Sequence, residues 1–357
     1  MYDVIIPGAS FARLAVANQL RGFRVLLLDR KPIGTGQTSA CGTILRLLEY
    51  WGLEEALLKV QNGLEVHTNA RDMMFPSPYP WCTFDYATLC DLLYKRSGAE
   101  FIQTAVQGID GNRVHTAAGN YEAQFNVDAT GWRATLASNS SNRFRRSRNR
   151  MNLGIESILD KPLRHNLNRD ALHFWYDDAI LPRGIGWAFP RENSVSVGVG
   201  SYGYEGKMLP GLERMTSRLG STYNSIHGTY FPNKLNHPVA ENLFIVGDAA
   251  GMCVALTGEG IRPAMFFGEA CGQIIRQCLD NERLPNEGLN AYARFVHSHR
   301  TFFDVFSAAQ LMLTRLPASV VDIIAQIASK ERVRSWVFET YWGLTRSWDK
   351  APTHVAI

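Results

Sequence analysis

The chain has 357 residues, of which 46% are hydrophobic and 20% are charged, and its formal net charge is +4. With no low-complexity tract, this composition is typical of a folded soluble protein and excludes a disordered chain. The positive charge is mild and is not accompanied by an RRM, zinc-finger or helix-turn-helix spacing, so we expect no nucleic-acid partner. The length allows two intertwined domains, or one domain with a large insertion.

The cysteines and the apolar segments bear on the compartment. The six cysteines form no CxxC pair, and the first strand begins at Tyr2 with no signal peptide before it. We therefore expect reduced thiols, a cytoplasmic protein and no metal site. The most apolar late stretch, residues 318–328, is interrupted by Asp322 and Gln326 and is shorter than the roughly 20 residues of a membrane span. Peripheral contact with a membrane remains open.

The first twenty residues hold the motif around which the chain is organised. Residues 2–6, YDVII, predict a buried parallel strand, residues 8–13, GASFAR, a turn, and residues 14–20 a helix. A second strand at 24–28 ends in Asp29. This order is typical of a dinucleotide-binding unit, in which backbone N–H groups at the helix N-terminus bind a pyrophosphate and the acid binds ribose hydroxyls.

The glycine fingerprint departs from GxGxxG at two positions. Gly8 is the first glycine, but Ser10 replaces the second and Arg13 the third. Serine adds only a hydroxymethyl group and can donate a hydrogen bond to a phosphate. The third glycine serves close helix–strand packing, so we expect the Arg13 side chain to leave that contact and bring its charge within reach of a diphosphate. By itself, the motif also fits a Rossmann-like unit without a cofactor.

The next segments, residues 43–131, are expected to contain both helices and strands. A helix is expected from Thr43 to Trp51 with Gly52 as its C-cap, and Arg46 on it is either a diphosphate clamp or a surface arginine. The other expected elements are two strands within 64–79, a helix at 85–94, a parallel strand at 100–102 and a meander over 106–127 that leads to Gly131.

The middle of the chain combines a basic run with an aromatic sheet. Five arginines fall within residues 143–150, which is either a solvated linker or an anion site for a phosphorylated substrate or an acidic membrane surface. Residues 153–199 predict antiparallel strands rich in aromatic side chains. Most of these rings are expected to be ordinary core.

A second anchor lies at residues 242–251, NLFIVGDAAG, where an apolar strand runs directly into Gly247 and Asp248 and the start of a helix is expected. The sequence TGEGI at 257–261 follows, then a helix at 263–279 and a mostly helical region over 289–348. Beside the first strand, this segment would bring a carboxylate to the middle of an extended cofactor and glycine-rich backbone to its ring.

With both anchors, the chain resembles the FAD proteins of the glutathione-reductase type, in their aromatic-hydroxylase branch, and within it the geranylgeranyl reductase family. The resemblance covers about residues 1–285. It is carried by the loop at 8–12, DATG at 128–131, GD at 247–248, GEG at 258–260, ACG at 40–42 and WAFP at 187–190. Ile185 stands where the family motif YxWxFP has its tyrosine, and Ala255 where many relatives have a proline.

The resemblance implies an α/β fold with a Rossmann-like FAD-binding domain, an inserted antiparallel-sheet substrate domain and a helical C-terminal tail. The implied FAD-binding domain covers residues 1–62, 83–135 and 240–285, and the substrate domain covers 63–82 and 136–239. Residues 286–357 form the C-terminal helical region.

The resemblance also implies the site residues. The expected substrate-binding residues are Trp175, Trp187, Phe189 and Pro190. The expected FAD-binding residues are Gly8, Ser10, Phe11, Ala12, Arg13, Asp29, Arg30, Cys41, Gly42, Arg46, Gly131, Gly247, Asp248, Gly258, Glu259, Gly260 and Ile261.

The implied activity is reduction of isolated carbon–carbon double bonds in an isoprenoid or similar apolar substrate by reduced FAD. Cys41 is our candidate proton donor, because a thiol with an ordinary pKa of about 8.5 is protonated at neutral pH; the alternative is a buried thiol that merely packs. No second dinucleotide motif is present, so NAD(P)H would bind transiently or a separate donor would supply electrons.

Two other functions remain open on the sequence. The same fold serves flavin monooxygenases that hydroxylate or epoxidise aromatic or polyketide-like substrates, so the fold alone does not choose. A flavin halogenase is less favoured because its lysine has no clear counterpart here. Arg13 in the diphosphate turn raises a further alternative, a degenerate flavoprotein that acts as a non-redox cyclase or ligand carrier.

Overall fold

The structure is a computed structural model that describes residues 1–8, 10–141, 144, 151–160, 167–203 and 208–350. The chain divides into two compact units, each composed of three separate segments of the sequence. Unit 1 comprises residues 1–36, 87–147 and 231–307, and unit 2 comprises residues 37–86, 148–230 and 308–357. The arginines between 143 and 150 lie outside the described residues.

Unit 1 is built on a mostly parallel sheet with the strand order β15-β16-β9-β1-β2-β6. Strand β1 pairs in parallel with β2 and β9, and its residues Val4, Ile5 and Ile6 are completely buried. Continuous apolar runs are typical of parallel strands that are covered on both faces. The strands are β1 (Tyr2–Pro7), β2 (Val25–Asp29), β6 (Glu100–Gln103), β7 (Val106–Asp110), β8 (Arg113–Thr116), β9 (Gly119–Asp128), β15 (Val239–Ala240) and β16 (Leu243–Ile245).

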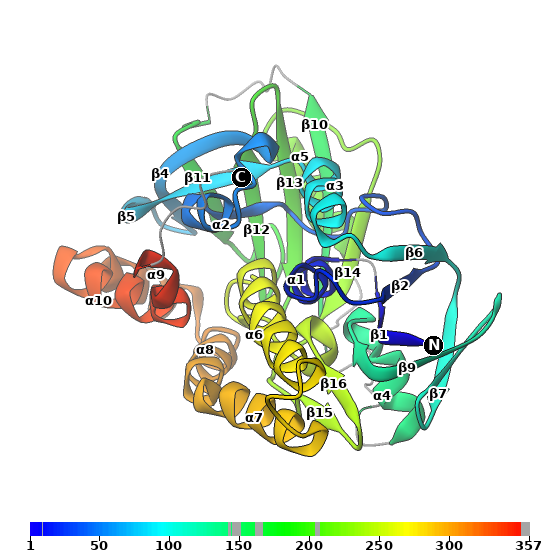
Figure 1. Cartoon of the computed structure of the whole chain (residues 1–357). Helices are drawn as coiled ribbons and strands as arrows, with labels where there is room; N and C mark the ends of the chain where they lie inside the picture. Colours follow the sequence, from blue (N-terminus) through cyan, green and yellow to red (C-terminus); the bar gives the residue numbers. More distant parts are fainter. Residues whose placement is uncertain (9, 142–143, 145–150, 161–166, 204–207, 351–357) are drawn as a thin grey trace. The chain divides into compact units, whose positions relative to one another are not determined.

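Two helices of unit 1, α1 (Phe11–Gln19) and α6 (Ile261–Leu279), pack against each other at very short range (Figure 1). A Cβ at Gly268 of α6 would lie 2.7 Å from the Ala12 carbonyl oxygen, and one at Gly272 would lie 2.6 Å from the Val16 carbonyl oxygen. The two glycines are therefore required for this approach. The other helices with residues in unit 1 are α3 (Tyr86–Ser97), α4 (Thr135–Ser140), α7 (Pro285–Ser298) and α8 (Arg300–Leu313).

Unit 2 is built on a second sheet with the order β14-β10-β13-β12-β11-β4-β5-β3. The pairs β10–β13, β13–β12, β12–β11, β4–β5 and β5–β3 are antiparallel, whereas β11 and β4 run parallel. The strands are β3 (Gly42–Ile44), β4 (Leu57–Thr68), β5 (Asp72–Phe84), β10 (Asn152–Asp160), β11 (Ala171–Tyr176), β12 (Gly184–Pro190), β13 (Ser194–Ser201) and β14 (His227–Phe231).

Helix α5 (Met208–Arg218) covers one face of this second sheet. Its buried residues Leu212 and Met215 share a core cluster with Val197 and Val199 of β13 and with Trp175 of β11. Because side chains alternate along a strand, the opposite face of β11 and β12 carries a different set of residues.

The tail of unit 2 consists of α9 (Ala318–Ser329), α10 (Glu331–Trp342) and the 3-10 segment η6 (Gly343–Lys350). Thr68 of β4 donates a hydrogen bond of 2.7 Å to Asp322 of α9, and Arg71 pairs with the same carboxylate at 3.2 Å. The described helices include none that is long and apolar enough to cross a bilayer.

The structure confirms the predicted fold class, with a Rossmann-like α/β unit, a second sheet that is mainly antiparallel and a helical C-terminal region. Two local predictions were wrong. Residues 42–44 form β3, so helix α2 (Leu45–Trp51) begins two residues later than expected. Gly247–Ala250 form a 3-10 turn rather than the start of a helix.

The predicted domains were defined by what they bind, FAD or substrate, and their boundaries stay a prediction. The two units are defined instead by contacts within the chain. Residues 37–62, predicted to belong to the FAD-binding domain, lie in unit 2.

Candidate functional site

The turn after β1 passes so close to the end of β9 that only glycine fits at position 8. Gly8 has a φ of +134°, and a Cβ there would lie 2.0 Å from the Ala129 carbonyl oxygen. The crossing is held by a hydrogen bond of 3.1 Å from the Ala129 N–H to the Pro7 carbonyl. The first glycine of the fingerprint thus brings the loop at 8–12 against DATG.

Ser10 stands at the N-cap of α1 in an extended conformation, and its hydroxyl makes no capping hydrogen bond. The first backbone N–H groups of a helix have no partner within the helix, and together with the helix dipole they favour an anion. The start of α1 is therefore an electropositive helix end that the Ser10 side chain does not cap.

Asp128 is completely buried and organises the loop that follows β9. Its Oδ1 accepts hydrogen bonds from the N–H and the hydroxyl of Thr130, at 3.0 and 2.6 Å, and its Oδ2 accepts one of 2.9 Å from the Ala137 N–H. Burial raises the pKa of Asp128, and these hydrogen bonds oppose the shift. The carboxylate therefore positions Gly131, which has a φ of +72° and open space beside it.

The second anchor meets the first at Gly247. This residue has a φ of +61°, and a Cβ there would lie 3.0 Å from the Ala12 side chain of α1. The strand before it is fixed by a hydrogen bond of 3.0 Å from the Val246 N–H to the Asp128 carbonyl. The ends of β1, β9 and β16 thus form one cradle of closely packed backbone, at the strand ends where α/β sheets bind ligands.

Asp248 lies beside the glycine-rich segment 258–260. Its Oδ1 is 3.5 Å from the position of a Cβ on Gly260. Burial raises the pKa of the Cys253 thiol well above its usual value, and the negative charges of Asp248 and Glu259 raise it further. Cys253 is therefore a neutral thiol near the carboxylates.

The Glu259 carboxylate is engaged by Arg262, one turn into α6. The two side chains are buried, and Arg262 donates through Nη2 at 2.9 Å and through Nε at 3.1 Å. A buried bidentate pair fixes the segment between Gly258 and Ile261. Any contact of Glu259 with a cofactor would therefore come from its backbone, and Arg262 is a functional candidate that the sequence analysis missed.

The expectation that Arg13 leaves the helix–sheet contact was wrong. Its side chain is completely buried, with Nη1 3.9 Å from Asp29 Oδ2 and the guanidinium over the Phe101 ring at 5.8 Å. The other Asp29 oxygen accepts a hydrogen bond of 2.9 Å from the Lys31 N–H. A buried cation near a buried carboxylate offsets part of the desolvation of both, which is why the long side chain stays inside. Arg30, next in the chain, is exposed.

In unit 2, the Cys41-Gly42 loop contacts the WAFP motif. Cys41 is buried in a left-handed conformation with a φ of +55°, and its thiol donates to the Ser39 carbonyl at 3.4 Å. A Cβ on Gly42 would lie 2.9 Å from the Phe189 ring. Two motifs separated by well over a hundred residues therefore meet, and Gly42 provides the space for the ring.

The expected substrate residues divide between the two faces of the sheet. Phe174 lies opposite Trp187 in the β11–β12 register, and its ring makes an edge contact with Phe189 at 5.3 Å. On the same face, the Trp187 Nε1–H donates to buried Glu156 at 2.7 Å, and His227 contacts the other oxygen of that carboxylate at 3.1 Å. Trp175 belongs to the other face and lies in the core under α5. Pro190 is buried at the end of β12, and its carbonyl accepts a hydrogen bond from Gln61 at 2.7 Å.

Arg46 lies in unit 2, and its guanidinium interacts with other residues of that unit. Its guanidinium donates to the Trp348 carbonyl of η6 and lies 3.6 Å from Glu49. The Tyr50 ring stacks on Trp348 at 5.0 Å, so α2 anchors the end of the described chain. A diphosphate contact of Arg46 stays a prediction.

The comparisons with known proteins agree with this geometry. The chain has the fold of solved structures that include a reductase-like protein, an FAD-dependent monooxygenase and FAD-dependent halogenases. A geranylgeranyl bacteriochlorophyll reductase-like protein from Thermoplasma acidophilum superimposes with a TM-score of 0.82 over 98% of both chains, at 17% identity. The flavin-dependent brominase Bmp2 superimposes with a TM-score of 0.72 at 15% identity, over 96% of this chain and 93% of the brominase.

Sequence similarity points to one family within this class. A digeranylgeranylglycerophospholipid reductase of Methanococcus vannielii is 28% identical over 169 residues, which cover 44% of this chain and 43% of the relative. The chain therefore aligns with less than half the length of this relative. No family model matches the sequence. The predicted resemblance to the geranylgeranyl reductase family is confirmed.

Replacement of Arg13 by methionine should destabilise unit 1. The variant keeps most of the volume but leaves the Asp29 carboxylate without its buried cation, so we expect a loss of roughly 1–3 kcal/mol in the free energy of unfolding. Urea unfolding of the purified chain measures it. The control is Arg24→Met, which removes an exposed arginine that lies over the Tyr2 ring. Equal effects of the two substitutions would show that the Arg13–Asp29 interaction contributes nothing.

Gly42→Ala should strain the Phe189 contact. The added methyl group overlaps the buried ring, so we expect a loss of about 1–3 kcal/mol in unfolding free energy. A second substitution, Phe189→Leu, removes the ring and should relieve part of that cost, which a double-mutant cycle detects. Additive effects of the two substitutions would mean that the two motifs are not coupled.

Proposed function

We propose that this protein is an FAD-dependent oxidoreductase that reduces carbon–carbon double bonds of an isoprenoid or similar apolar substrate. The observation that carries the proposal is the cradle of backbone around Gly8, Gly131 and Gly247, in a chain similar in sequence to digeranylgeranylglycerophospholipid reductases. The contact of Gly42 with Phe189 supports the reductase reading, because it joins the two motifs of unit 2 that carry the family resemblance.

The residues of unit 1 fit an FAD molecule. The N–H groups of Phe11 and Ala12 at the start of α1 would hold the diphosphate, and Asp29, at the end of β2, would bind the adenosine ribose. Asp248 would bind the ribityl chain, and the backbone of 258–260 would face the flavin ring. Gly8 and Gly247 allow the turns of this arrangement to approach each other closely, because a Cβ at either would lie 3.0 Å or less from a neighbouring protein atom. The Arg13 side chain is buried beside Asp29 and Phe101.

Bound and reduced, FAD would supply a hydride to one carbon of the alkene, and the protein must supply a proton to the other. Cys41 is the donor that we propose. Its left-handed backbone is a conformation that non-glycine residues adopt at a cost, and such residues are frequent at functional sites. The thiol already donates a hydrogen bond to the Ser39 carbonyl, so it carries the proton that a donor needs. Solvent would restore that proton after each turnover.

The aromatic face of unit 2 suits an apolar chain. Phe174, Trp187 and Phe189 lie together on one face of β11 and β12. A hydrogen bond from the Trp187 indole N–H to buried Glu156 holds that ring in place. Large rings held in fixed positions would bind the substrate and exclude water from the reacting carbons. We propose NAD(P)H, bound transiently, or a separate protein as the electron donor.

The decisive measurement is an absorption spectrum of the purified protein with added FAD, followed by anaerobic reduction and addition of an unsaturated isoprenoid lipid. We expect a bound flavin spectrum that is bleached on reduction and restored by the lipid without oxygen. Cys41→Ala should slow this lipid-dependent reoxidation and leave the flavin spectrum intact, whereas Cys90→Ala, in α3, should not.

Two outcomes would contradict the proposed activity, and a third would contradict only the role of Cys41. Reoxidation by oxygen alone, with an oxygenated product, would identify a monooxygenase or epoxidase. Absence of flavin at any FAD concentration would favour a non-redox cyclase or ligand carrier. Equal rates for the Cys41 and Cys90 variants would exclude Cys41 as the proton donor and leave the reductase activity standing.

We also propose that the tail of unit 2 touches the membrane that holds such a lipid. The helices α9 and α10 expose the apolar side chains of Ile323, Ile327 and Trp336, with Trp336 63% exposed. Exposed apolar side chains on amphipathic helices can insert at a lipid interface. Sedimentation with phospholipid vesicles should show binding by the native chain that is lost in an Ile323→Ser, Ile327→Ser, Trp336→Ser variant. Equal sedimentation of the two proteins would exclude this contact.

A further inference from the structure

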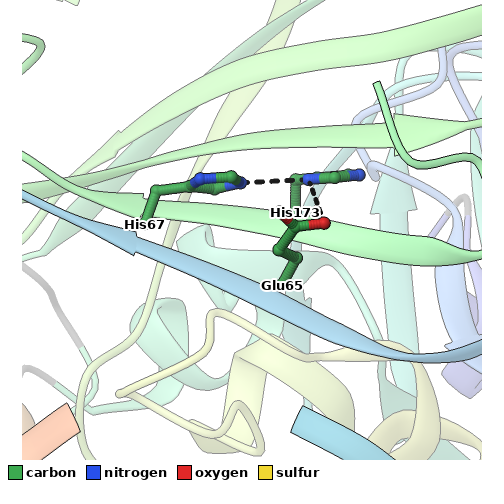
Figure 2. A group of neighbouring side chains, drawn as sticks. All are labelled: Glu65, His67 and His173. Carbon is green, nitrogen blue, oxygen red and sulfur yellow. Dashed lines mark hydrogen bonds and ion pairs between the residues drawn. The ribbon is translucent and has the colours of Figure 1, made fainter. Parts of the chain in front are cut away.

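Figure 2 shows Glu65, His67 and His173 gathered on neighbouring strands of unit 2. Strands β4 and β11 are parallel, and their register sets Glu65 opposite His173. His67 lies two residues beyond Glu65, so the three side chains project from the same face. One ligand atom from each lies within 4.8 Å of the others, and His67 Nε2 is 3.0 Å from His173 Nδ1.

The outer nitrogen of each imidazole has an acceptor as its partner. His67 Nδ1 lies 2.6 Å from the carboxylate Oδ1 of Asp72, which is the cross-strand neighbour of His67 on β5. His173 Nε2 lies 2.6 Å from the backbone carbonyl oxygen of Asn168. A carboxylate and a carbonyl only accept hydrogen bonds, so both outer nitrogens carry the ring proton.

This assignment leaves a lone pair on each inner nitrogen. A neutral imidazole has one N–H and one lone pair, so His67 Nε2 and His173 Nδ1 face each other as two acceptors. The carboxylate Oε2 of Glu65 is 3.7 Å from His173 Nδ1 and adds negative charge at the same point. Three electron-rich atoms in a largely buried position favour a cation between them.

We propose that Glu65, His67 and His173 form a site for a divalent transition-metal ion of the zinc class. Two imidazole nitrogens and a carboxylate oxygen are ligands that zinc prefers, and magnesium and calcium do not favour imidazole. The outer hydrogen bonds to Asp72 and to the Asn168 carbonyl are those that orient metal-bound histidines. A proton shared between the two nitrogens is the competing occupant.

The geometry needs little adjustment to accept the ion. Two nitrogens, each about 2.1 Å from a tetrahedral zinc, lie about 3.4 Å apart, so the present separation of 3.0 Å has to open by only about 0.4 Å. Glu65 is partly exposed, so its side chain can move to complete the set. The fourth position would be taken by water.

The surroundings hold the two rings in place and indicate the role of the ion. The Trp175 ring stacks on His67 with a centroid distance of 4.2 Å and an interplanar angle of 7°, and Trp175 belongs to the core under α5. Strand β4 comes from the segment 37–86 and β11 from the segment 148–230. The ion would thus cross-link two segments of unit 2 that are far apart in the sequence, and we assign it a stabilising role.

The test uses the full chain without a histidine tag, dialysed against a chelator and then titrated with Zn²⁺ or with Co²⁺ as a spectroscopic probe. We expect one ion per chain, a higher midpoint of thermal unfolding with Zn²⁺, and visible Co²⁺ bands typical of four or five ligands. Glu65→Gln removes a ligand and Asp72→Asn removes an orienting carboxylate. We expect Asp72→Asn to weaken binding 10- to 100-fold, as loss of an outer partner typically does, and Glu65→Gln to weaken it at least as much.

Matched controls are Glu122→Gln and His115→Asn in the β8–β9 hairpin of unit 1, where these side chains pair with Arg113 and Asn120. These variants should bind the ion like the native chain. Equal affinity in the Glu65, Asp72 and control variants would overturn the proposal, as would an unchanged unfolding midpoint. A Co²⁺–thiolate absorption band would assign the ion to cysteine instead, and no binding would leave the histidines sharing a proton.

Discussion

The structure of unit 1 depends on the close approach of backbone at the ends of three neighbouring strands. Gly8 lies against the Ala129 carbonyl, Gly247 against Ala12, and Gly268 of α6 against the Ala12 carbonyl. At each contact a Cβ would come within about 3 Å of another atom, so a glycine is required. Side chains are thereby kept out of the turns, and backbone N–H groups remain to bind an anion at the start of α1.

Three carboxylates around this cradle, those of Asp29, Asp128 and Glu259, are buried, and each has a polar or charged neighbour. Glu259 is held by Arg262, Asp29 lies near Arg13, and Asp128 is satisfied by backbone N–H groups and a hydroxyl. A buried charge without a partner would cost several kcal/mol, so these pairs fix the loops in one arrangement. Arg13 is instructive, because a residue that seems too long for its position is accommodated by a carboxylate on the next strand.

In unit 2, side chains alternate between the two faces of the sheet, so the aromatic rings and the histidine pair lie on opposite faces. One face of β11 and β12 carries the rings of Phe174, Trp187 and Phe189, which we propose as the binding surface for the apolar substrate. On the other face, Trp175 packs into the core beside the pair His67 and His173. The same alternation that builds the sheet thus keeps the proposed metal ligands away from the aromatic face.

The sequence by itself determined the class of fold, because glycine positions, apolar runs and terminal acids are local patterns that the backbone must obey. It located the loop at 8–12, the GD at 247–248 and the motifs at 41–42 and 187–190. The tertiary structure brings Gly247 against the loop at 8–12, and Gly42 against the motif at 187–190. Only the tertiary structure decided where long side chains go. Arg13 stays inside because Asp29 and Phe101 are there, and Arg46 donates to Trp348, which is 302 residues away. Glu65, His67 and His173 have no recognisable spacing, since their proximity comes from the pairing of β4 with β11, which no local pattern encodes.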